Sequence, residues 1–131
     1  MYMSFWYKIS RVMKPREETS DYAKHPELKT RYYGASFTRV FRKAKQLENE
    51  SGNINKLIKA DEERGEVFVE ATNGKDRFDV IMTIVQVGPN ETAIDIVSSI
   101  RNKAGDFGKN FPIIVYVLKE FDQSFPNIKK G

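Results

Sequence analysis

Cysteine is absent from this sequence of 131 residues, and histidine occurs once, as His25. Without cysteine the chain can form no disulfide bond, thiolate nucleophile or zinc site built from cysteine and histidine. A catalytic triad would have to use His25, which stands beside Pro26 in a segment without a catalytic pattern. We therefore assign no catalytic residue, expect neither a metal ion nor a cofactor, and favour a noncatalytic protein.

Long apolar runs are also missing. The longest candidate, residues 111–118, is less than half of the roughly 20 apolar residues that a membrane-spanning helix needs. Lys8 interrupts the apolar N-terminal run before it reaches the length of a signal-peptide core. We expect a soluble cytoplasmic protein without a membrane partner.

Charge is distributed unevenly along the chain, which has 22 basic and 18 acidic residues and a formal net charge of +4. Residues 1–52 carry 11 basic against 6 acidic side chains, residues 53–100 carry 5 against 9, and residues 101–131 carry 6 against 3. An acidic middle between two mildly basic ends is not the continuous basic surface that nucleic acids require. We therefore do not expect a nucleic-acid partner.

The length is typical of one domain, which we assign to residues 1–131. Residues 1–34 mix proline, charge and aromatic residues without a period. We expect a largely irregular segment there, packed on the body of the domain by its aromatic side chains.

Residues 35–50 have the apolar spacing of a helix with one buried stripe, and Ser36 is the expected N-cap. The stripe consists of Phe37, Val40, Phe41, Ala44 and Leu47. Its basic residues face water in this arrangement and are the surface on which a nucleic acid would bind if one did: Arg39, Arg42, Lys43 and Lys45.

The period then changes from 3.6 to 2, which is typical of strands. Residues 56–72 predict two strands joined by a turn at 62–65, and the Asn73-Gly74 pair predicts a hairpin. Residues 77–87 and 91–100 give two more strands, separated by a turn at 88–90. Connections this short join antiparallel neighbours, so the middle of the chain is expected to be a four-stranded meander.

A last helix is expected after Asn110, which we assign as its N-cap, with Pro112 in the first turn. Its apolar residues cover most of the circumference, which favours deep packing on one sheet face. The predicted fold class is α+β: a four-stranded antiparallel meander with an N-terminal and a C-terminal helix on one face, in the order α-β-β-β-β-α.

The connection at 98–110 is the candidate ligand site. Basic side chains, polar side chains and a helix N-terminus together favour a phosphorylated or other anionic ligand. The residues proposed to bind it are Arg101, Lys103, Asp106, Lys109 and Asn110. Asp106 would oppose an anion, and the alternative is a purely structural connection that uses Gly105 and Gly108.

Asp95 interrupts an apolar strand. A carboxylate in this position faces solvent between buried neighbours or is buried against a basic partner such as Arg101 or Arg77. A structural ion pair is favoured over a general base, because structural ion pairs perturb pKa values as active sites do.

Three blocks, HPELKTRYYG, DEERGEVFVEAT and ETAIDIVSSIRNKAGDFGKN, resemble an uncharacterised family of small bacterial proteins known as a domain of unknown function, with members in bacilli described as cytosolic proteins. The resemblance spans roughly residues 25–123, and the family pattern after the last strand corresponds to Ser99, Arg101, Gly105, Asp106, Gly108 and Asn110. It implies a compact bacterial cytosolic domain and supplies no activity.

The leading functional hypothesis is a noncatalytic binding or interaction domain with an unknown small molecule or protein as partner. An apolar ligand would lie between the last helix and the sheet. The alternative is an anion site or weak enzyme at 98–110. Self-association into a homodimer through an edge strand stays open.

Overall fold

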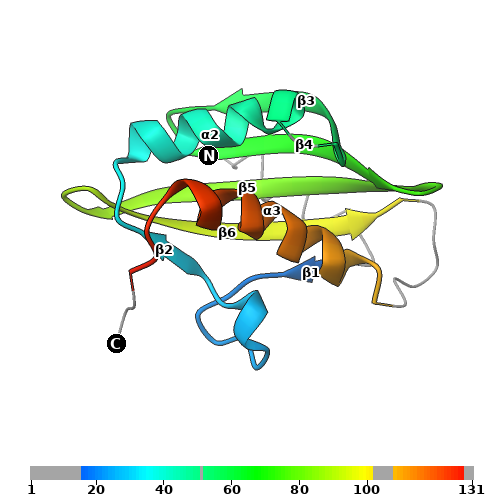
Figure 1. The fold of residues 1–131 in the computed structure, drawn as a ribbon, viewed down its shortest axis with the longest axis horizontal. Helices are drawn as coiled ribbons and strands as arrows, with labels where there is room; N and C mark the ends of the chain where they lie inside the picture. The colour runs from blue at the N-terminus through cyan, green and yellow to red at the C-terminus, as the bar shows by residue number, and fades with distance from the viewer. Residues whose placement is uncertain (1–15, 51, 102–107, 129–131) are drawn as a thin grey trace, which may run out of the picture.

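Figure 1 shows the fold in a computed structural model, which describes residues 16–50, 52–101 and 108–128. The predictions made for residues 1–15, Lys103, Gly105 and Asp106 lie outside these ranges. None of the described helices is long and apolar enough to cross a membrane.

The chain is α+β, as predicted, but the sheet has six strands instead of four. Two short strands precede the first α-helix, so the predicted order α-β-β-β-β-α is wrong at its N-terminal end. The elements are β1 Arg16–Glu18, η1 Pro26–Leu28, β2 Arg31–Tyr33, α2 Phe37–Glu50, β3 Ile54–Asp61, β4 Glu66–Asn73, β5 Asp76–Gly88, β6 Glu91–Ile100 and α3 Asn110–Ser124.

The sheet is antiparallel, with the order β1-β6-β5-β4-β3, and β2 also pairs with β6. The predicted meander is therefore confirmed for β3 to β6. β1 pairs with residues 97–99 and β2 with residues 92–94, so two separate strands share one edge of β6. At the other side, β3 pairs only with β4 among the described strands, and it carries two register irregularities together with Lys56 and Lys59. Lysines and bulges are devices that oppose edge-to-edge pairing.

The helix caps divide into one confirmed and one wrong prediction. Ser36 caps α2, since its Oγ accepts a hydrogen bond from the backbone N–H of Arg39 at 3.3 Å. Asn110 does not cap α3: Lys109 occupies the N-cap without a side-chain hydrogen bond, and Asn110 is the first helical residue. Its buried Oδ1 instead accepts a hydrogen bond from Ser98 Oγ on β6 at 2.9 Å.

Both helices lie on the same face of the sheet (Figure 1). The predicted alternation of β5 is confirmed, because Phe78, Val80, Met82 and Ile84 are all buried in the core on this face. Side chains from α2 and α3 complete that core. They occupy the space between helix and sheet in which we expected an apolar ligand, and the cavity described below lies on the other face.

Tyr33 links β2 to α3 by a hydrogen bond. Its ring is fully buried, and its hydroxyl donates a hydrogen bond to Asp122 Oδ1 at 2.7 Å. Asn127 donates a second hydrogen bond to the same oxygen at 3.0 Å. Burial and then the bond to Asp122 raise the pKa of Tyr33 well above its ordinary value of 10.0.

Because of this shift, the free energy of unfolding depends on pH in the alkaline range. The unfolded chain loses the Tyr33 proton as pH rises through about 10, whereas the folded chain keeps it, so the free energy of unfolding must fall above that pH. We predict that Tyr33→Phe removes up to about 1.4 kcal/mol per pH unit from this slope. Urea titrations between pH 9 and 11 measure it, and equal slopes in the two proteins would contradict the assignment.

Gly65, in the turn between β3 and β4, has a φ of +69°, and a Cβ there would collide with the carbonyl oxygen of Ile84. Gly74 has a φ of +64° but open space around it. We predict that Gly74→Ala costs about 1 kcal/mol, from the left-handed backbone alone, and that Gly65→Ala costs at least about 2 kcal/mol more. Equal losses in urea unfolding would show that the turn relaxes freely.

Candidate functional site

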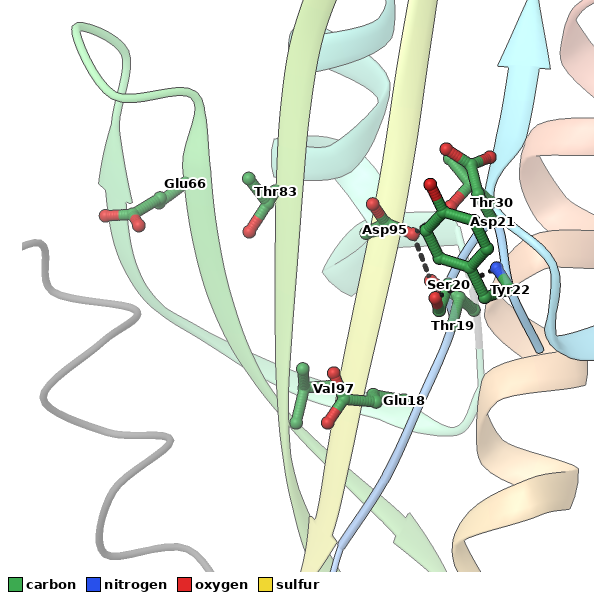
Figure 2. A pocket seen from close by; sticks show the side chains of 10 residues that line it. All are labelled: Glu18, Thr19, Ser20, Asp21, Tyr22, Thr30, Glu66, Thr83, Asp95 and Val97. Atoms are coloured by element: carbon green, nitrogen blue, oxygen red, sulfur yellow. Dashed lines mark hydrogen bonds between the residues drawn. The ribbon is translucent and has the colours of Figure 1, made fainter.

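A cavity of about 530 Å³ lies on the sheet face opposite the helices, beside the edge of β6 (Figure 2). Its volume is within the range of sites that hold small molecules. The described residues that line it are Glu18, Thr19, Ser20, Asp21, Tyr22, Thr30, Glu66, Thr83, Asp95 and Val97.

The floor of the cavity is a polar row across three strands. Glu66 of β4 lies opposite Thr83 of β5, and Thr83 lies opposite Asp95 of β6. Figure 2 shows the three side chains on neighbouring strands. Because successive strand residues point to opposite faces, each of these three is adjacent in sequence to residues that enter the apolar core. Thr83 Oγ1 is buried and finds no hydrogen-bond partner among the described residues.

Asp95 is held by two hydroxyl groups. Thr19 Oγ1 donates to Asp95 Oδ1 at 2.7 Å, and Thr30 Oγ1 donates to the same oxygen at 2.6 Å. Neither Arg101 nor Arg77 is its partner, so the predicted ion pair is wrong. The threonines stand at the two ends of the connection between β1 and β2, which brings them to the same carboxylate.

Thr19 also completes the hydrogen-bond ladder of β6. Its backbone N–H donates to the carbonyl oxygen of Ile96 at 2.8 Å, and its Oγ1 accepts from the N–H of Ile96 at 2.8 Å. One residue therefore spans the gap between β1 and β2 and orients Asp95.

The cavity is acidic, although the chain as a whole is basic. Four of its lining residues are carboxylates, and none of the lining residues that the structure describes is a lysine or an arginine. Asp21 at the rim accepts a hydrogen bond from the hydroxyl of Tyr32 at 2.9 Å. Burial and then this bond raise the pKa of Tyr32.

The described residues of the predicted anion site are engaged with protein partners. Arg101 Nε donates to Asp79 Oδ1 at 2.9 Å, and Arg101 Nη1 lies 3.5 Å from Glu70. The hydrogen bond to Asp79 raises the pKa of Arg101. Lys109 Nζ donates to Asp76 Oδ2 at 2.9 Å. Together with the bond between Asn110 and Ser98, these contacts attach the flanks of 98–110 to β5 and β6.

Most of the cavity was not visible in the sequence. Asp95 stands out in the sequence because it interrupts an apolar strand, but the predicted basic partner is replaced by two threonine hydroxyls. Its partners Thr19 and Thr30 come from a segment without periodicity and lie 76 and 65 residues away. Across the described ranges, no group of three or more histidine and carboxylate residues could hold a metal ion.

Comparison with known proteins does not assign the chain. No protein-family model matches it, and no curated protein is significantly similar to it. The resemblance to the bacterial family stays a prediction.

The same substitution at Thr19 and at Thr30 distinguishes the roles of the two side chains. Thr19→Val removes a donor to Asp95 and leaves the buried N–H of Ile96 without its acceptor, whereas Thr30→Val removes only a donor. We predict losses of about 3 kcal/mol for Thr19→Val and about 1.5 kcal/mol for Thr30→Val. Urea unfolding measures both, and an equal or reversed order would show that Thr19 is not the residue that completes the edge.

Proposed function

We propose that the protein is a noncatalytic binding domain whose acidic cavity takes a small organic cation, an amine with N–H donors. The observation that carries the proposal is the state of Asp95. Both of its hydrogen bonds reach Oδ1, and no described residue donates to Oδ2. A carboxylate oriented in this way, on the wall of a cavity, is a preorganised acceptor.

An amine satisfies what the cavity presents. Its N–H groups can donate to Asp95, while the hydroxyls of Ser20 and Thr83 supply further acceptors. Its positive charge is favourable among four carboxylates, where an anion would be repelled. A protein carboxylate and the ammonium group of a ligand form charge-assisted hydrogen bonds, which are stronger than hydrogen bonds between neutral groups.

The remaining predictions are compatible with this function. The resemblance to a bacterial cytosolic family supports a role in the bacterial cytoplasm. The outer edge of β3 is the surface on which a homodimer would form, and its lysines and register irregularities weigh against it.

Putrescine and spermidine are suitable probes in isothermal titration calorimetry. We predict that both bind, that affinity falls with added salt, and that Asp95→Asn weakens binding at least about tenfold, the equivalent of one charge-assisted hydrogen bond. Glu120→Gln on α3, at the opposite face, removes the same charge and is the control. Failure of both amines to bind, or an equal loss in the control, would refute a specific cation site.

A further inference from the structure

The face that carries the cavity also carries three apolar side chains, one from each of three adjacent strands. Phe68 of β4 lies opposite Ile81 of β5, and Ile81 lies opposite Val97 of β6. We call these three residues the apolar row. We propose that residues 1–15 of the same chain dock on the apolar row and cover it.

Burial is the first observation. Ile81 is 0% exposed and Val97 is 2% exposed, yet neither belongs to the core cluster beneath the helices. Both described helices lie on the other face (Figure 1). A side chain in the middle of a sheet face that no layer covers stays in contact with water, so this face must be covered by chain that belongs to neither α2 nor α3.

The composition of residues 1–15 is the second observation. Nine of the fifteen residues are apolar or aromatic: Met1, Tyr2, Met3, Phe5, Trp6, Tyr7, Ile9, Val12 and Met13. A segment this apolar needs an apolar surface against which to bury those side chains.

Position and charge favour the same occupant. Residue 15 leads directly into β1, where Glu18 lies opposite Val97, so the segment joins the sheet beside the apolar row. Fifteen residues reach across three strands spaced about 4.8 Å apart, even at the helical rise of 1.5 Å per residue. The segment carries three basic and no acidic residues, while Glu66, at 4% exposure, lies two residues from Phe68 on β4. An opposite charge therefore lies beside the apolar row.

Trp6 is the only tryptophan, so its fluorescence reports on this segment alone. If residues 1–15 dock, the folded chain emits at a shorter wavelength than the urea-unfolded chain and acrylamide quenches it several-fold less. Ile81→Lys, which places a cation against a basic segment, should shift the emission toward that of the unfolded chain. Val85→Lys, on the same face of β5 but half exposed and outside the apolar row, should leave it unchanged.

A second variant tests the proposal independently, in case Ile81→Lys does not fold. Reversing the charges of the segment, with Lys8→Glu, Arg11→Glu and Lys14→Glu, leaves the described core intact and should also increase quenching. Emission equal to that of the unfolded chain, in a protein that is folded by circular dichroism, would overturn the proposal. Quenching that depends on protein concentration, together with a dimer mass in native mass spectrometry, would assign the cover to a second copy and overturn it too. Glu66 and Val97 border both the cavity and the apolar row. Asp95→Asn leaves the apolar row unchanged and Ile81→Lys leaves Asp95 in place, so either proposal can still fail alone.

Discussion

The edge of β6 is the constraint on which the rest of the structure depends. β6 pairs with β5 along one side and with β1 and β2 along the other, and Thr19 closes the gap between the two short strands. A buried strand cannot leave its N–H and C=O groups unpaired without a cost of about 1–3 kcal/mol for each group. Thr19 accepts the hydrogen bond from the backbone N–H of Ile96 and also donates to Asp95. One residue therefore supports both the edge pairing of β6 and the orientation of Asp95 in the cavity.

Alternation along the strands separates the core from the cavity. On β5, Val80, Met82 and Ile84 enter the core under the helices, while Ile81 and Thr83 face the other way. Polar residues on the second face can therefore change without altering core packing. The alternation also fixes the register, since a slip of one residue would exchange the two faces.

The sequence predicts the helices and strands that are long enough to show a periodic pattern of apolar residues. Helix spacing identifies α2 and α3, and alternation with turn residues identifies β3 to β6, because each has enough residues to show its period. β1 and β2 have three residues each, too few for any period, and they form only because β6 offers an unpaired edge. The partners of Asp95 escaped prediction for the same reason: contacts between distant residues are set by tertiary pairing. Asn110 was misassigned because a buried serine on β6 competes with the cap position for its side chain.

Net charge is a poor guide to the local charge at the cavity, because acidic and basic side chains are unevenly distributed over the fold. Arg77 and Arg101 are paired with Glu70 and Asp79 at one end of the second sheet face. Toward the other end, Glu66 and Asp95 come from the acidic middle of the sequence and line the cavity with Glu18 and Asp21. A ligand in the cavity responds to charges within a few ångströms, since those farther than about 10 Å are screened by salt. Among the residues that the structure describes, the carboxylates around the cavity, and not the net charge of +4, therefore support the proposal of a cationic ligand.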